Sequence, residues 1–226
     1  MSEIPGGAMS HRPVHFLWLL DCSGSMSING KIESLNFAVR EAIPEMQRVA
    51  HENATAQLMV RVITFSDGAQ WHVQAPTPID DFQWSDVTTY GVTDLGAALR
   101  LAAAELQTPP MPERALQPVL VLVSDGQPTD DWRAGLQAVD RTPWGRLAVR
   151  VAIAIGQDAD IPMLKEFLAN PELEPLQAHN PTQLVGAIRW ASTVAVRVAS
   201  TPRGGTSAAA LSAVPSVPAD DSADIW

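Results

Sequence analysis

The chain has 226 residues, and its 15 Lys and Arg against 25 Asp and Glu give a formal charge of −10. This acidic balance argues against nucleic-acid binding, which needs clustered positive charge, and against docking on anionic lipid. Hydrophobic residues make up 46% and charged residues 18%, a composition typical of globular proteins. We therefore expect a folded protein that binds neither nucleic acid nor a membrane.

The single cysteine, Cys22, excludes an internal disulfide and any zinc site built from several cysteines. The longest apolar runs, such as residues 119–123, are too short to cross a bilayer. The first thirteen residues lack the basic and apolar regions of a secretory signal. Together these features predict a cytoplasmic location.

Composition divides the chain into three parts. Residues 1–13 are rich in Gly, Pro and Ser and predict a flexible N-terminal arm. Residues 14–200 carry the regular hydrophobic patterns of one domain. Residues 201–226 predict a disordered linker, rich in Gly, Ser, Ala and Pro, which leads into an acidic C-terminal tail that ends in Ile225 and Trp226.

Short apolar runs alternate with helical patterns along the central part of the chain. Near-continuous apolar runs indicate strands that helices cover on both faces, and they occupy residues 14–20, 58–65, 69–73, 119–123 and 149–155. Apolar residues spaced by three and four predict helices over residues 31–51, 93–107 and 181–198. This alternation predicts an α/β fold with a doubly wound, mostly parallel central sheet and helices on both faces.

Three local features refine this prediction. Ser66, Asp67 and Gly68 form a short turn of the hairpin type, so the strands on either side should pair as one antiparallel edge. Pro44 lies inside the first helical pattern and predicts a kink or an early end there. Asn180 before a proline is typical of a helix start.

Polar side chains follow the ends of predicted strands or precede a helix, at the edge where doubly wound sheets bind their ligands. Five of them carry oxygen atoms: Asp21, Ser23, Ser25, Thr93 and Asp125. Oxygen ligands suit a hard divalent cation rather than zinc or copper. Two carboxylates are too few for a dedicated calcium cage but fit magnesium, and they leave room for a ligand from another molecule.

Several of these residues also have an ordinary structural interpretation. Ser23, Ser25 and Thr93 are residue types that cap helices and turns. Asp94 is expected to help begin the helix that follows it. Cys22 should point away from the ligand side as a small buried thiol.

The three motifs in chain order resemble the pattern of von Willebrand factor A domains over residues 14–199: Asp-x-Ser-x-Ser at 21–25, Gly-x-Thr-Asp-Leu at 91–95 and Ser-Asp-Gly at 124–126. The resemblance implies a metal-ion-dependent adhesion site, abbreviated MIDAS, with ligands Asp21, Ser23, Ser25, Thr93 and Asp125. It further implies a protein-interaction module that holds Mg²⁺, or Mn²⁺ or Ca²⁺, and binds an acidic residue of a protein partner through that ion.

The compact form of the chain, with Pro128, Thr129 and Asp130 after the last motif, is similar to bacterial TerY-type proteins of tellurite-resistance and stress operons. This narrower resemblance implies a role in a bacterial stress-response or signalling system. It also implies an operon-encoded kinase or phosphatase as the partner.

Two other functions are open alternatives. A magnesium-dependent hydrolase is one, but Ser23 lacks the Gly-x-Ser-x-Gly elbow and the chain has no phosphate-cradling loop, so we expect no enzyme activity. The other is a scaffold that binds through its C-terminal tail and holds a purely structural metal. In that tail, Ile225 and Trp226 could anchor in another protein, a tail carboxylate could visit the metal site, or the end could simply be disordered.

Overall fold

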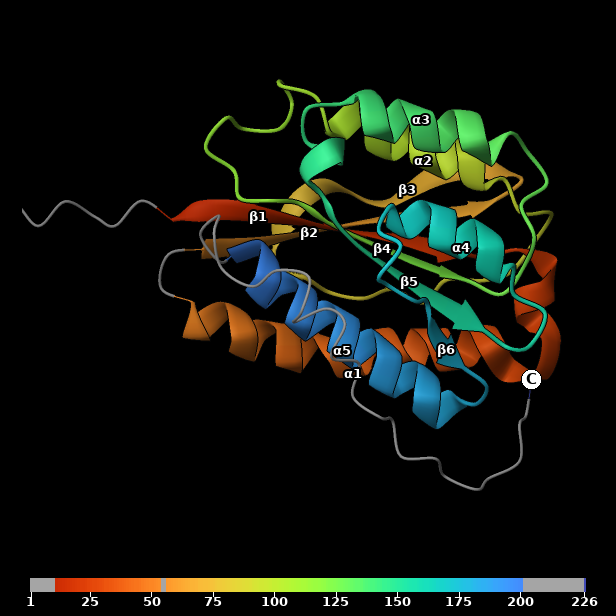
Figure 1. Ribbon diagram of the computed structural model, residues 1–226. Coiled ribbons are helices and arrows are strands. Elements are labelled where there is room, and N and C mark those ends of the chain that lie inside the picture. The colour runs from red at the N-terminus through yellow and green to blue at the C-terminus, as the bar shows by residue number, and fades with distance from the viewer. Residues whose placement is uncertain (1–10, 54–55, 201–225) are drawn as a thin grey trace, which may run out of the picture.

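The computed structural model describes residues 11–53, 56–200 and 226. Within them lies one six-stranded sheet in the order β3-β2-β1-β4-β5-β6, in which only β3 is antiparallel to its neighbour (Figure 1). The strands are β1 (Arg12–Asp21), β2 (Ala56–Ser66), β3 (Gly68–Pro78), β4 (Val119–Ser124), β5 (Val149–Ile155) and β6 (Leu176–Ala178). The predicted α/β fold, with its mostly parallel sheet and antiparallel edge, is confirmed.

Helices cover both faces of this sheet (Figure 1). One layer consists of α1 (Lys31–Glu52) and α5 (Pro181–Ser200), and the other of α2 (Leu95–Glu105), α3 (Trp132–Arg141) and α4 (Ile161–Leu168). Two short 3₁₀ segments, η1 (Gly24–Gly30) and η2 (Gly145–Leu147), complete the described elements. Among the helices described, none has both the length and the apolar character that a membrane span requires.

The strand β1 lies inside the sheet between β2 and β4, and this position explains why its residues are apolar at successive positions. Phe16 and Trp18 are fully buried in the cluster that packs against α1 and α5. Leu17 and Leu19 point the other way, into the cluster beneath α2, α3 and α4. Because successive side chains of a strand face opposite sides, a sheet covered twice needs hydrophobic residues at both parities.

The first helix rules out one of the two outcomes predicted at Pro44, the early end. It does not end near Pro44 but continues to Glu52. Proline removes one helical hydrogen bond, that between its own nitrogen and the Arg40 carbonyl. Pro44 is exposed, so water can satisfy that carbonyl, while buried side chains such as Val39 and Met46 hold the helix on the sheet.

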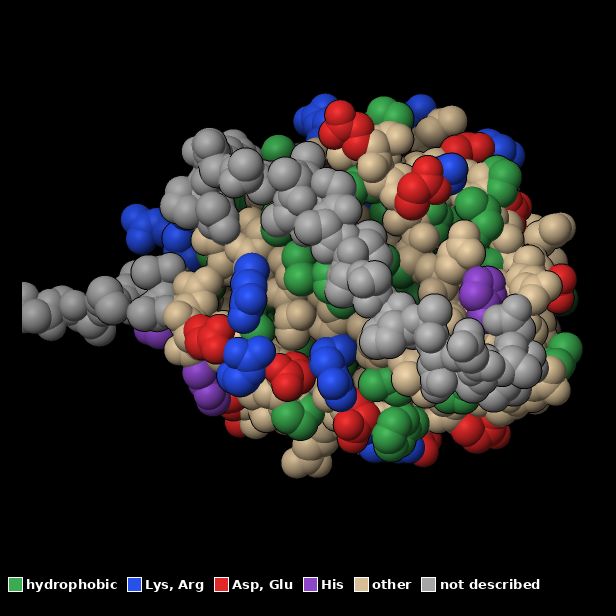
Figure 2. All heavy atoms as spheres, turned by 60° about the horizontal axis from the view of Figure 1, so that its bottom comes forward, with side chains coloured by type: hydrophobic (Ala, Val, Ile, Leu, Met, Phe, Trp, Pro, Cys, Tyr) green, Lys and Arg blue, Asp and Glu red, His purple; other side chains and the backbone are tan. Residues whose placement is uncertain are grey.

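The layer of α1 and α5 carries both signs of charge on its outer surface. Figure 2 shows Lys and Arg side chains interspersed with Asp and Glu over this face. Two ion pairs cross between the helices, Arg189 with Glu41 at 3.5 Å and Arg197 with Glu52 at 3.2 Å. The face is therefore mixed rather than a basic patch of the kind that binds phosphate.

Two of the three predicted parts of the chain consist mostly of residues that the structure does not describe. Residues 1–10 of the predicted arm (1–13) and 201–225 of the predicted linker and tail (201–226) lie outside the described ranges. The division into an arm, a domain over 14–200 and a tail therefore stays a prediction.

Candidate metal centre

The loop after β1 is organised around the buried carboxylate of Asp21. Its Oδ1 accepts a hydrogen bond from the Ser23 backbone nitrogen at 2.9 Å, and its Oδ2 accepts one from Ser124 Oγ at 2.6 Å. Burial raises the pKa of Asp21 to about 6 against these hydrogen bonds, which favour the charged form. Asp21 thus ties the end of β1 to the end of β4.

The serines and the second aspartate form a continuous chain of contacts. Ser23 Oγ lies 3.0 Å from Ser25 Oγ, and Ser25 Oγ donates to Asp125 Oδ1 at 2.7 Å. Asp125 follows β4, a hundred residues after Ser25. Parallel pairing of β1 with β4 brings these two loops to the same edge of the sheet.

Thr93 reaches the same place from a third segment. Its Oγ1 and Ser25 Oγ each lie 3.6 Å from the point where a Cβ on Gly126 would stand, so the two hydroxyls border the same space over this glycine. Backbone hydrogen bonds dock the loop before Thr93 onto the loop after β1, since Tyr90 N donates to Cys22 O at 2.9 Å. The structure therefore brings all five predicted residues together.

A lysine that the sequence analysis missed also enters the cluster. Lys31 Nζ lies 2.7 Å from Asp125 Oδ2, and the two side chains are 8% and 0% exposed. A signal for it exists in the sequence. Lys31 stands four residues before Leu35, on the apolar face of α1, and a charged residue on that face needs a buried partner.

Asp94 holds the expected position but has a different role for its side chain. It occupies the N-cap position of α2 without a side-chain cap. Its carboxylate instead accepts from Gly68 N at 2.8 Å and from Thr129 Oγ1 at 2.9 Å. The cap comes from Asp130, which accepts from the backbone nitrogens of Gly96 and Ala97. Asp94 therefore braces the loop that carries the threonine at position 93.

The donor set fits a hard divalent cation. It contains two carboxylates and three hydroxyls, all oxygen donors. Across the part of the chain that the structure describes, no cluster of three or more His, Cys, Asp or Glu side chains is arranged to hold a metal. Cys22 is 1% exposed, and burial raises the pKa of its thiol to about 12, as a buried structural cysteine requires.

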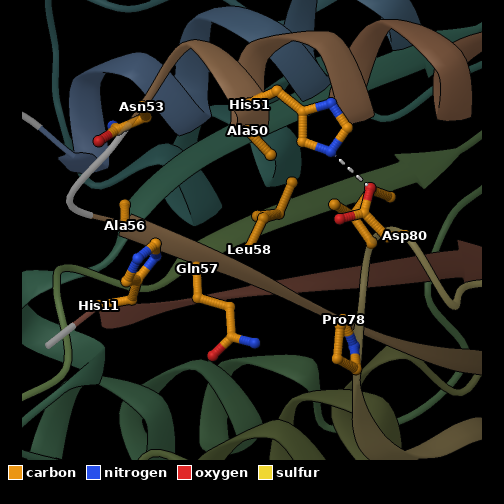
Figure 3. Close-up of a pocket in the computed structure, with 10 residues that line it drawn as sticks. His11, Ala50, His51, Asn53, Ala56, Gln57, Leu58, Pro78 and Asp80 are labelled. Atoms are coloured by element: carbon orange, nitrogen blue, oxygen red, sulfur yellow. Dashed lines mark hydrogen bonds and ion pairs between the residues drawn. The ribbon is translucent and has the colours of Figure 1, made fainter. Parts of the chain in front are cut away.

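A separate pocket lies at the opposite end of the strands. Its volume is about 330 Å³, and it lies between the last turn of α1, the start of β2 and the end of β3 (Figure 3). His51 Nε2 and Asp80 Oδ1 are 2.9 Å apart there. Because the five clustered residues stand at the other end of β1 or beside it, this pocket adds nothing to the candidate centre.

Known proteins share features of this arrangement. Residues 16–127 match the family model of the von Willebrand factor type A domain, whereas a sequence search of curated proteins finds no match. A von Willebrand factor type A structure from Catenulispora acidiphila gives a TM-score of 0.63 at 17% identity, over 82% of this chain and 43% of that chain.

Two further structures were solved with metal. Proximal thread matrix protein 1 from the mussel byssus, with a zinc-occupied MIDAS motif, gives a TM-score of 0.59 at 15% identity, over 81% of this chain and 49% of that chain. The manganese-loaded TRAP protein of Plasmodium vivax gives a TM-score of 0.56 at 19% identity, over 78% of this chain and 72% of that chain.

These structural similarities establish the fold, because all three identities are below 20%. The chain spans less than half the length of the bacterial and mussel structures. The similarity in sequence lies in the matched residues, which include the end of β1, the threonine loop and the end of β4. Residues 16–127 are therefore similar in sequence to the von Willebrand factor type A domain.

Proposed function

We propose that this domain is a metal-dependent protein-interaction module. In this proposal Asp21, Ser23, Ser25, Thr93 and Asp125 hold Mg²⁺, which Mn²⁺ or Ca²⁺ can replace, and an acidic residue of a partner completes the coordination. The observation that supports it best is the convergence of three hydroxyls and a carboxylate from three separate segments, with Ser25 Oγ in contact with Asp125 and with the space over Gly126.

The charges around the cluster favour an acidic partner. A divalent cation supplies a positive centre to which a partner's carboxylate can bind when solvent is excluded. Three of the five proposed ligands are neutral hydroxyls, and the Lys31 ammonium offsets the charge of Asp125. The site therefore adds little negative charge of its own, although the chain as a whole carries −10.

The narrower proposal concerns the biological setting. The sequence similarity to TerY-type proteins supports a kinase or phosphatase encoded in the same operon as the partner, in a bacterial stress-response or signalling system in the cytoplasm. Thr129 and Asp130, which contribute to that similarity, brace and cap α2 in this fold. Support for this narrower setting thus comes from the sequence alone.

Capture of partners from the native cell tests the proposal. The full chain is the bait, with and without a chelator, and as Thr93→Ala beside a matched Thr193→Ala variant. Thr193 lies on α5, where its hydroxyl donates to the Arg189 carbonyl. A partner that is lost on chelation and with Thr93→Ala, but kept by Thr193→Ala, supports a metal-dependent interface. A partner kept under every condition contradicts it.

The two alternatives predict different results. If the protein is a scaffold with a structural metal, chelation lowers its melting temperature but does not release its partner. A hydrolase cleaves a generic phosphate ester with Mg²⁺ and loses this activity with Asp21→Ala. We prefer binding over catalysis because a magnesium-dependent hydrolase would need further carboxylates, either to hold a second metal ion or to act as the nucleophile. The cluster has hydroxyl groups at these positions instead.

A further inference from the structure

The tryptophan at position 226 lies against the rim of the candidate metal centre. Its indole Nε1 donates to the Asn29 carbonyl at 2.9 Å. Its Cβ stands 3.5 Å from the point where a Cβ on Gly156 would be, and Lys31 Nζ lies at the same distance from that point. Trp226 is half-buried and packs against the core cluster of the α1 and α5 layer.

These contacts place Trp226 against segments that adjoin the proposed ligands. Asn29 is in η1, the 3₁₀ segment that begins directly after Ser23. Gly156 follows β5, the neighbour of β4, and Asp125 directly follows β4. Lys31 Nζ contacts Asp125 and lies, like the Cβ of Trp226, beside Gly156. Figure 1 marks this end of the chain beside the start of α1.

The surface around the centre is apolar as well as polar. Among the described residues, four large hydrophobic side chains are exposed, and three of them, Ile28, Tyr90 and Val92, belong to the loops that flank the cluster. Ile28 adjoins Asn29, whereas the loop of Tyr90 and Val92 stands on the β2 side. Large apolar side chains that stay exposed and gather on one surface are typical of an interaction site.

We propose that Asn29, Lys31 and Gly156 form a tryptophan-binding subsite at the edge of the candidate metal centre, occupied in this chain by its own Trp226. The Asn29 carbonyl accepts the indole N–H, and Gly156 and Lys31 lie beside the Cβ of the tryptophan. An acidic partner that approaches the centre from the β5 side then competes with Trp226. The competition rests on the proposed function, whereas the indole contact itself does not require a metal. The ligand class of the subsite is a peptide that combines a tryptophan with acidic residues, as the sequence of residues 219–226 does.

Indole NMR of the full metal-free chain tests the subsite. Uniform ¹⁵N labelling gives a signal from each tryptophan, and Trp226→Phe identifies one of them, with Trp190→Phe as a matched variant on α5. The subsite predicts that the Trp226 N–H is protected from exchange with water and shifts when Mg²⁺ is added. A Trp226 signal that exchanges as fast as that of free tryptophan would overturn the inference.

A peptide titration tests the competition. The probe is an amidated, fluorescein-labelled peptide with the sequence of residues 219–226, added in Mg²⁺ buffer to the wild-type chain, to Trp226→Ala and to Trp190→Ala. Removal of the internal competitor predicts binding at least about tenfold tighter to Trp226→Ala, with Trp190→Ala like the wild type. Equal affinity for all three chains, or no binding, overturns the competition. Protection of the indole without Mg²⁺ uptake supports the subsite and contradicts the proposed function.

Discussion

The ammonium of Lys31 lies 2.7 Å from Oδ2 of Asp125, and both side chains are buried. The other carboxylate oxygen of Asp125 accepts the hydroxyl of Ser25. Asp125 also acts on Asp21, since its negative charge contributes to the raised pKa of that carboxyl group. A lysine at this position therefore lets two carboxylates share one edge of the sheet in the protein without metal.

The first prediction concerns Lys31→Met. The change leaves the buried Asp125 carboxylate without its cationic partner, so the metal-free chain should lose about 3 kcal/mol of unfolding free energy. Saturating Mg²⁺ should restore more stability to this variant than it adds to the wild type, because the ion no longer meets a neighbouring ammonium. Denaturant melts with and without Mg²⁺ measure both effects.

Lys165→Met is the matched control. Lys165 pairs with Glu174 at 2.8 Å, but these side chains are 49% and 64% exposed. Exposed ion pairs contribute little, so this variant should stay within about 0.5 kcal/mol of the wild type. If the two lysine variants were equally stable without metal, the Lys31–Asp125 pair would have no stabilising role.

The second prediction concerns Gly126→Ala. A Cβ at this position would lie 3.6 Å from Ser25 Oγ and from Thr93 Oγ1, which is ordinary contact distance. The fold should therefore tolerate the methyl group, with an unfolding free energy within about 0.5 kcal/mol of the wild type. The space that the two hydroxyls share is then filled, so Mg²⁺ affinity should fall by about tenfold or more. Unchanged affinity in a folded variant would place the ion elsewhere.

The third prediction is a pH dependence of stability caused by His15. Burial, with a smaller effect of the Arg61 guanidinium, lowers the pKa of His15 from 6.5 to about 4 in the fold. Between these values the unfolded chain binds more protons than the folded one, so the unfolding free energy falls as the pH falls. The contribution of neutral His15 to the unfolding free energy is about 3 kcal/mol. This contribution is complete above pH 6.5 and is lost as the pH falls to about 4.

His15→Leu should remove this dependence. The structure gives His15 Nε2 no hydrogen-bond partner among the described residues, so leucine sacrifices none. The quantity to measure is the difference between the wild type and His15→Leu at pH 7.5 and pH 4.5. Asp21, whose raised pKa gives a dependence of opposite sign, is present in both chains and cancels. An exposed-histidine variant, His11→Leu, should follow the wild type, and an equal response of all three chains would contradict the assignment to His15.

The sequence was sufficient to predict the sheet and the helices that cover both of its faces. Alternating apolar runs and helical patterns predicted five of the six described strands and the hairpin edge. The elements it missed are short: β6 has three residues, α4 has eight and α3 has ten. Such segments contain too few positions for a period to stand out, and their placement depends on tertiary packing.

The site could be predicted as far as strand ends determine it. Asp21 ends β1 and Asp125 directly follows β4, its parallel neighbour, so their convergence follows from the topology. Contacts between positions far apart could not be found in this way. Lys31 meets Asp125 across 94 positions, Ser124 meets Asp21 across 103, and Trp226 meets Asn29 across 197. A position such as that of Lys31 on an apolar helix face can signal that a partner exists, but only the folded arrangement reveals which residue the partner is.

Calorimetric titration of Mg²⁺ into the metal-free chain, with Ser25→Ala compared to Ser27→Ala, measures metal binding by the five clustered residues. The two serines lie in the same segment, but Ser27 Oγ donates to the Gly24 carbonyl and is not part of the cluster. A metal centre at this cluster predicts uptake of a single ion, with an affinity that Ser25→Ala weakens about tenfold or more and Ser27→Ala leaves unchanged. No uptake by the wild-type chain, or equal affinities for the two serine variants, would contradict it.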